Sequence, residues 1–267
     1  MTPPSVVLTI GGFDGSGGAG TLADARAIQL NGGYSCAIVT AITAQNTTSV
    51  DHIEPVSPAL IRRQLQCVVE DFQIDAIKIG MLPTVECVDT LTRYLGAGGF
   101  RCPVVVDPVM CATSGGQLIN DDVLGALIDR LVPLTTLITP NVAEAGELTN
   151  RLIKTIEQAV EAGRQLVRMG CKHVLVKGGH LDVDRGTDVW CHEDGFETFE
   201  PTEVQDGTVR GTGCMLSSAI ACYLAQGRPM REAILSSKAF VNRAIANRHS
   251  LGKGTALTAV GIQVPRA

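Results

Sequence analysis

A short glycine-rich stretch, Gly211-Thr212-Gly213-Cys214, could do chemistry because it leads directly into a predicted helix. Residues 215–226 are small and apolar at helical spacing, and Gly227 is typical of a helix C-terminal cap. A glycine turn that opens directly into a helix presents free backbone N–H groups and the positive end of the helix dipole. Such a place binds anions, phosphate above all. The alternative is a tight turn into an ordinary core helix.

Cys214 is the candidate acid or base of this stretch. A thiol at a helix N-terminus is expected to have a lowered pKa, since the dipole and the N–H groups favour the thiolate. We therefore expect Cys214 to be the most reactive cysteine of the chain. The alternative is a buried, inert cysteine that only packs.

Oxygen-bearing side chains elsewhere suit the metal that phosphoryl transfer needs. Asp107, Asn141 and Glu144 are hard ligands for Mg²⁺, directly or through water. Asn141 and Glu144 also fit a helix N-cap with its third residue, so capping alone could explain them. Lys177 follows another strand and could neutralise phosphate charge, or could be an ordinary solvated lysine.

The elements that would position these residues alternate along the chain. Apolar strands alternate with helical patterns, which predicts a parallel sheet covered on both faces. Strands are expected at 6–10, 35–43, 52–56, 75–80, 103–107, 137–140 and 173–177, and a hairpin at 188–199. Helices are expected at 22–30, 58–69, 85–95, 121–131, from 141, and at 155–169, 213–226 and 231–249. No linker or repeat appears, so residues 1–267 are expected to form one domain.

Polar residues gather where the predicted strands end, and ligands of such folds bind beyond the carboxyl ends of the strands. They are Gly12 with Asp14, Gln45 with Asn46, Gly80 with Met81, Asp107, Asn141 with Glu144, and Lys177 with Gly178. Turn chemistry explains one or two such places, whereas six on one rim favour a binding site.

Composition excludes several classes of protein. Of 267 residues, 45% are hydrophobic and 18% charged, which predicts a large core and little disorder. The net charge of −5 argues against nucleic-acid and anionic-membrane partners. Neither a signal peptide nor a membrane span is expected. The nine cysteines form no C-x-x-C pair, which suits reduced thiols in the cytoplasm.

Seven motifs, in order over residues 6–254, resemble the hydroxymethylpyrimidine kinase / hydroxymethylpyrimidine phosphate kinase family, the thiamin-pathway branch of the ribokinase superfamily. The motifs are Gly12-x-Asp14-x-x-Gly17-Gly18-Ala19-Gly20, Thr43-Ala44-Gln45-Asn46-Thr47, Lys78-Ile79-Gly80-Met81-Leu82, Asp107-Pro108-Val109-Met110, Thr139-Pro140-Asn141-x-x-Glu144-Ala145, Val176-Lys177-Gly178-Gly179-His180 and Gly211-Thr212-Gly213-Cys214-x-Leu216-Ser217-Ser218-Ala219-Ile220-Ala221. Any one of them is weak evidence, but seven in order are specific.

The resemblance implies an α/β fold, a ribokinase-like three-layer sandwich with a mostly parallel sheet, and a homodimer. It implies that ATP and Mg²⁺ serve two phosphorylations, of 4-amino-5-hydroxymethyl-2-methylpyrimidine and then of its monophosphate. By position it places Gly12, Asp24, Gln45, Met81 and Val109 around the pyrimidine. It makes 211–214 an anion hole, with Cys214 catalytic. Asn141 and Glu144 match the superfamily's metal and phosphate motif, and we expect Lys177, Thr212 and Lys238 to contact the nucleotide.

Two departures leave the substrate open. The family commonly has Ile-Gln-Ala-Asp where this chain has Thr21-Leu22-Ala23-Asp24, and Thr-His where it has Val209-Arg210. Arg210 could contact phosphate or be an exposed charge. The alternatives are a pyridoxal kinase, a non-catalytic vitamer-binding protein on the same scaffold, and a dinucleotide oxidoreductase based on Gly15-x-Gly17-x-x-Gly20.

Overall fold

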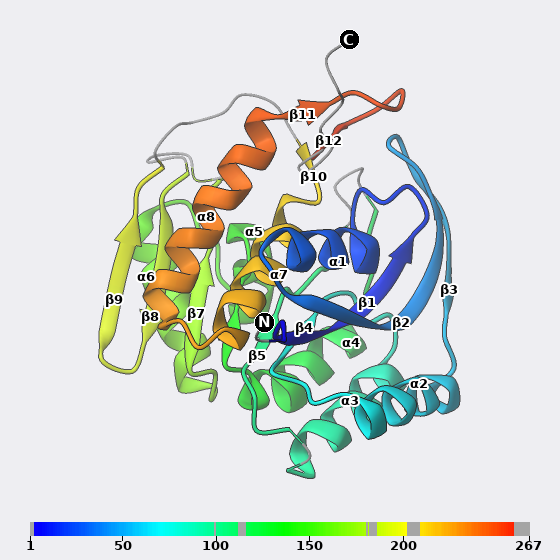
Figure 1. The fold of residues 1–267 in the computed structure, drawn as a ribbon. Helices are drawn as coiled ribbons and strands as arrows, with labels where there is room; N and C mark the ends of the chain where they lie inside the picture. Colours follow the sequence, from blue (N-terminus) through cyan, green and yellow to red (C-terminus); the bar gives the residue numbers. More distant parts are fainter. Residues whose placement is uncertain are drawn as a thin grey trace.

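The computed structural model describes residues 3–98, 100–111, 116–179, 181, 186–201 and 209–258. A central sheet runs through the molecule, with helices in front of it and behind it (Figure 1). Its strands lie in the order β3-β2-β1-β4-β5-β6-β7-β8-β9. Their bounds are β1 Val6–Asp14, β2 Tyr34–Gln45, β3 Val50–Pro55, β4 Ala76–Ile79, β5 Val104–Val106, β6 Leu137–Ile138, β7 His173–Val176, β8 Asp188–His192 and β9 Gly195–Phe199.

The sheet is parallel in its centre and antiparallel at its edges. From β2 to β7 all neighbours pair parallel, whereas β3, β8 and β9 pair antiparallel. The central strands are buried on both faces, which explains their continuous apolar sequence. The predicted mostly parallel α/β sheet is confirmed.

Two helical layers cover the sheet. Alternate strand residues serve different layers: Val7 packs in a core with α1, α7 and α8, and Leu8 packs in a core with α2 to α6. The three-layer arrangement follows from this alternation. The helices are α1 Gly20–Leu30, α2 Pro58–Asp71, α3 Val85–Gly96, α4 Asp121–Ala126, α5 Val142–Thr149, α6 Ile156–Arg168, α7 Thr212–Ala225 and α8 Met230–Ala246.

A second, three-stranded sheet lies beyond the strand ends, near the tip of the β2–β3 hairpin (Figure 1). It pairs β10 (Val209–Arg210) with β12 (Ala256–Thr258) and β12 with β11 (Arg248–His249). The N–H groups of Gly254 and Thr255 bond Thr47 in the hairpin loop. The sequence pattern did not predict this sheet, because its strands have only two or three residues.

Some predicted boundaries were wrong. β1 continues past Ile10 to Asp14, with a bulge between Gly11 and Gly12, so that its polar end lies within the strand. The helix predicted at 121–131 keeps regular α geometry only to Ala126. A wider turn covers 127–131 and a tight turn covers 132–134, where Pro133 has no N–H to continue the helix.

Among the residues that the structure describes, no helix is both long and apolar enough to cross a membrane. The expectation of one domain over residues 1–267 stays a prediction.

Candidate active site

One cavity of about 780 Å³ lies at the carboxyl ends of the parallel strands, a size typical of small-molecule sites. Every residue predicted for the site lines it, from Gly12 near the N-terminus to Lys238 on α8. Residues more than 200 positions apart therefore meet in one space. Their individual roles stay predictions.

The glycine turn enters α7 in a left-handed conformation that favours glycine. Gly211 is the N-cap residue, with φ of 82°, and has no side chain to cap the helix. A Cβ on Gly211 would lie 2.0 Å from the carbonyl oxygen of Gly18. The turn is thus pressed against the loop after β1. The N–H groups of 212–214 open the helix at the cavity, as an anion cradle requires.

The expected activation of Cys214 is wrong for the free protein. Burial raises the pKa of its thiol to about 12, against an opposing effect of Lys78, and the carboxylates of Asp24 and Asp107 raise it further. The N–H of Gly20 favours the thiolate but does not outweigh these causes. Cys214 is therefore a neutral thiol at pH 7.

The raised pKa of Cys214 predicts the order in which the cysteines are alkylated. At pH 8 a thiol of pKa about 12 is only about 10⁻⁴ ionised, and the thiolate is the reactive form. We expect iodoacetamide to label the exposed Cys67 and Cys111 well before Cys214. Peptide mapping over time measures this order, with Cys214→Ala as the control that leaves the early peptides unchanged. Early labelling of Cys214 would contradict the raised pKa.

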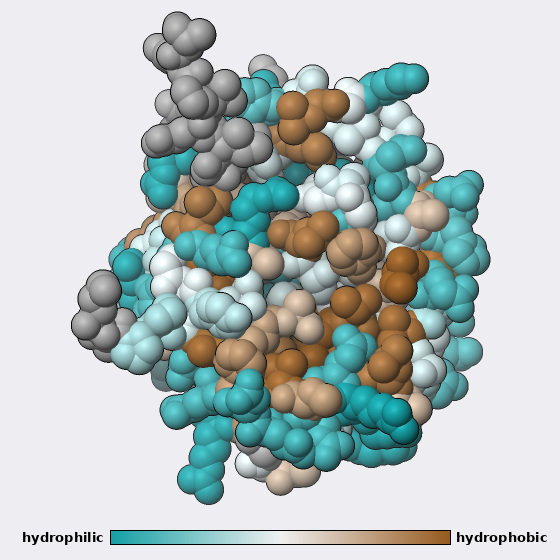
Figure 2. All heavy atoms as spheres, turned by 45° about the vertical axis from the view of Figure 1, so that its right-hand side comes forward, coloured by the Kyte–Doolittle hydropathy of each residue, from teal (hydrophilic) through white to brown (hydrophobic). Residues whose placement is uncertain are grey.

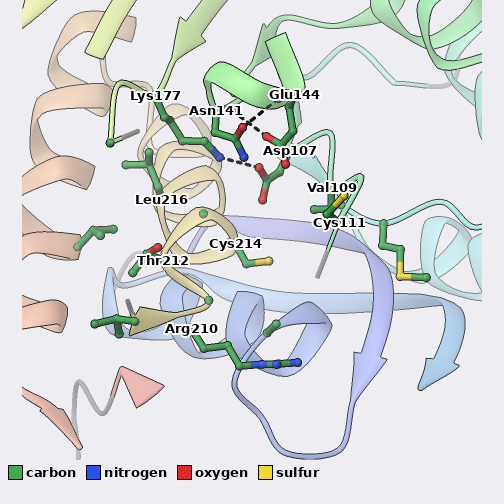
Figure 3. A pocket seen from close by; sticks show the side chains of 18 of the residues that line it. Asp107, Val109, Cys111, Asn141, Glu144, Lys177, Arg210, Thr212, Cys214 and Leu216 are labelled. Atoms are coloured by element: carbon green, nitrogen blue, oxygen red, sulfur yellow. Dashed lines mark hydrogen bonds and ion pairs between the residues drawn. The ribbon is translucent and has the colours of Figure 1, made fainter. Parts of the chain in front are cut away.

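A charged pair lies beside the cradle. Lys177 Nζ donates to Asp107 Oδ1 at 3.1 Å, and a Cβ on Gly213 would lie 3.2 Å from the same Nζ. Figure 3 shows the pair above the N-terminus of α7, with Cys214 between this pair and Arg210 in that view. Lys177 is only 17% exposed in its side chain, so the interpretation as a solvated lysine is wrong.

Asn141 and Glu144 cap α5, as the alternative interpretation predicted. Asn141 Oδ1 accepts from the Glu144 N–H at 2.9 Å, and Glu144 Oε2 accepts from the Asn141 N–H at 2.8 Å. Burial raises the pKa of Glu144 to about 7; Lys177 opposes this and Asp107 adds to it. A cation near Glu144 would stabilise its charged form.

The described residues contain no group of three or more His, Cys, Asp and Glu side chains that could hold a metal by themselves. This donor set does suit Mg²⁺, which usually keeps several waters and binds one or two carboxylates together with substrate phosphates. Asp107 and Glu144 are the residues that would hold it.

The raised pKa of Glu144 predicts how the stability of the protein depends on pH. Between about pH 4.5 and 7 the folded carboxyl is protonated and the unfolded one is ionised, so stability falls as pH rises through this window. Above about pH 7 the ionised Glu144 carboxylate lowers the free energy of unfolding by about 3 kcal/mol relative to pH 4. Glu144→Gln keeps an acceptor for the cap, and we expect it to be more stable than the parent by up to that amount at pH 8 and by nothing near pH 4. Urea unfolding without nucleotide measures this, and the exposed Glu147→Gln on α5 is the control. Equal stability of Glu144→Gln and parent at pH 8 would refute it.

Asp24 differs most from its expected role. Its carboxylate is 0% exposed and accepts from Thr9 Oγ1 at 2.6 Å and from Ser218 Oγ at 2.8 Å. Lys78 Nζ donates to both of its oxygens, at 2.8 and 2.9 Å. A carboxylate has about four acceptor positions, and these bonds use them. Asp24 therefore anchors Lys78 in the wall of the cavity and is not a free acceptor for a substrate.

The other residues expected around the substrate also line the cavity. A Cβ on Gly12 would lie 3.2 Å from Met81 Sδ, and Val109 follows β5, where its N–H donates to the Asp107 carbonyl. Gln45 ends β2 and accepts a hydrogen bond from Arg210. Arg210 is 2% exposed, so the interpretation as an exposed charge is wrong.

Lys238 is paired with Asp188, whose other oxygen accepts from the Gly178 N–H at 2.9 Å. Sequence reasoning missed Asp188 and Lys78 as members of the site. A lysine inside the apolar strand β4 was the available signal for Lys78. Asp188 carried no such signal, because it opens an antiparallel strand.

The phosphomethylpyrimidine kinase family model matches residues 14–259. The chain belongs to the phosphomethylpyrimidine kinase family. The hydroxymethylpyrimidine/phosphomethylpyrimidine kinase of Rhizobium meliloti is 40% identical over 94% of this chain and 94% of its own length. The thiamine biosynthesis bifunctional protein ThiED of Geobacter sulfurreducens is 42% identical over 94% of this chain, which spans 51% of that relative's length.

Solved structures agree with this family and confirm the ribokinase-like fold. Phosphomethylpyrimidine kinase of Clostridium difficile superposes with a TM-score of 0.81, at 37% identity over 90% of this chain and 99% of that one. An ADP complex of Bacillus subtilis pyridoxal kinase superposes with a TM-score of 0.88, at 31% identity over 96% and 97%. The family's fold thus also carries pyridoxal kinases.

Proposed function

We propose that this chain uses ATP to phosphorylate the hydroxymethyl group of 4-amino-5-hydroxymethyl-2-methylpyrimidine and then the resulting monophosphate, in thiamin biosynthesis. The observation that carries the proposal is the single cavity. The glycine cradle, Lys177 and Asp107 line it together with Gln45, Met81 and Val109. A phosphate donor and a small ring could lie there together, in a chain of the phosphomethylpyrimidine kinase family.

Each group has a stated part in this proposal. The N–H groups of 212–214 receive the transferred phosphoryl group, and Lys177 offsets its charge. The thiol of Cys214 must first lose its own proton, and the thiolate form, a small fraction at pH 7, then takes the proton of the substrate hydroxyl. Mg²⁺ carried by ATP, held near Asp107 and Glu144, would neutralise phosphate charge. Lys238 breaks its ion pair with Asp188 and then contacts the nucleotide.

The test is mass spectrometry of the products from ATP, Mg²⁺ and hydroxymethylpyrimidine. A diphosphate product supports both steps, and a monophosphate alone supports only the first. Turnover of ATP without a phosphorylated product would favour the non-catalytic binding protein.

Pyridoxal kinase is the second candidate, favoured by the superposition on the Bacillus subtilis pyridoxal kinase. Comparing kcat/KM for hydroxymethylpyrimidine and pyridoxal decides between them. The dinucleotide interpretation has no such support. The glycine loop on which that interpretation rests packs against the C-terminal part of the chain. A Cβ on Gly18 in this loop would lie 2.7 Å from Leu257 and 2.9 Å from Arg210.

We also propose that the chain is a cytoplasmic homodimer, as the family resemblance implied. Apolar side chains gather on the face that carries the β2–β3 hairpin (Figure 2), and Ile42 on β2 is 55% exposed there. Such a patch is typical of an interaction surface. Sedimentation equilibrium measures the oligomeric state, and a monomer at micromolar concentration would contradict the dimer.

A further inference from the structure

Among the residues that the structure describes, Arg210 is the largest fully buried side chain, and it lies in the cavity wall directly before the cradle. Its Nη2 donates to Gln45 Oε1 and, at 3.4 Å, to Asp14 Oδ2. Asp14 accepts in addition from the N–H and Oγ of Ser16 and from the Ala19 N–H. The arginine thus joins the small second sheet to the ends of β1 and β2.

The chemistry of this contact settles which way the Gln45 amide faces. A glutamine amide has an acceptor oxygen on one side and a donor NH₂ on the other. A guanidinium has only donors. The amide atom against Arg210 must therefore be the oxygen, and the NH₂ group of Gln45 is on the side away from Arg210.

Arg210 is costly for the protein to hold in this place. Within the described part of the chain its Nε and Nη1 are buried and have no hydrogen-bond partner. Unpaired buried donors are destabilising, and a buried ion pair is often no more stable than an apolar replacement. Since packing alone does not require the charge, a role in the cavity explains it better.

We propose that Arg210 is a specificity-determining residue that fixes Gln45 as a hydrogen-bond donor to the substrate. The cavity then selects a ring that presents an acceptor there, a ring nitrogen or an oxygen, and disfavours a ring that presents an amino group. This inference rests on the proposed function in so far as the ligand is a heteroaromatic alcohol.

The first test needs no ligand. Side-chain NMR of ¹⁵N-labelled protein, with the Gln45 NH₂ signals assigned by their loss in Gln45→Leu, measures the order of that amide. We expect an ordered amide in the parent and in Arg210→Lys, because lysine also has only donors. We expect a mobile amide in Arg210→Met. An equally ordered amide in Arg210→Met overturns the inference, whatever the protein phosphorylates.

The second test is a double-substitution cycle measured as kcat/KM for whichever of hydroxymethylpyrimidine and pyridoxal is phosphorylated. Gln45→Glu removes the donor and keeps the contact with Arg210. We expect it to lower kcat/KM about tenfold in the parent and in Arg210→Lys, and less in Arg210→Met, where the amide is already free to turn. Equal losses in all three backgrounds overturn the inference. If neither alcohol is phosphorylated, the proposed function fails, while the NMR result still decides on Arg210.

The variants should remain folded. In Arg210→Met the Asp14 carboxylate keeps its three hydrogen bonds from Ser16 and Ala19. Thermal unfolding of each variant checks this, and a purely structural arginine would lower Tm in Arg210→Met without changing the response to Gln45→Glu.

Discussion

Replacing Cys214 with alanine is expected to slow the first phosphorylation by about 10²–10⁴-fold, the usual loss when a general base is removed. The thiol lies in the cavity beside the cradle, where the substrate hydroxyl must lose its proton. In the second step the nucleophile is a phosphate oxygen that is already ionised. We therefore expect a much smaller loss when the monophosphate is supplied directly. The two rates are measured separately by quenched-flow mass spectrometry.

The raised pKa of Cys214 gives this prediction a second readout. Because the thiol has a pKa of about 12, its ionised fraction rises about tenfold per pH unit through the neutral range. kcat/KM of the first step should rise with pH from 7 to 9 in the parent and stay flat in Cys214→Ala. Equal losses in both steps would instead point to a role in shaping the anion cradle. No loss in either would make Cys214 a packing residue.

The site could be predicted from the sequence where topology alone brings residues together. Asp107 and Lys177 are 70 positions apart, but both follow strands of one parallel sheet, so both reach the same edge. The same reasoning placed Gln45 and Glu144. It needs only the strands and their direction, which the apolar runs supply.

Properties that depend on packing between distant segments could not be predicted. A backbone N–H does favour the thiolate of Cys214, but burial outweighs this effect. The charges of Lys78, Asp24 and Asp107 also act on the thiol, and only the fold brings them there. Likewise Asp24 is one turn into a helix in sequence, and only the fold reveals Lys78 beneath it. Arg210 was ambiguous for the same reason, since its short strand is defined by a partner almost fifty residues later.

The cradle itself depends on Gly211, and Gly211→Ala is expected to lower kcat/KM by about 10²–10³-fold, as when an oxyanion donor is removed. The new Cβ would lie 2.0 Å from the Gly18 carbonyl oxygen, and φ of 82° is strained for alanine. Backbone, not a flexible side chain, is in the way, so the turn must shift by about 1 Å or more. The N–H groups of 212–214 then no longer point where the phosphoryl group arrives.

Gly227 at the other end of α7 provides a matched control. Its φ of 79° strains alanine in the same way, but nothing lies within 4 Å of the position that a Cβ would take. We expect Gly227→Ala to lose about 1 kcal/mol of stability and no activity. If Gly211→Ala loses no more activity than Gly227→Ala, measured as kcat/KM at matched folded fractions, the phosphoryl group does not bind at this turn. If only Gly211→Ala loses activity, backbone strain is excluded as the cause, because both variants carry it, and the displaced cradle remains as the explanation.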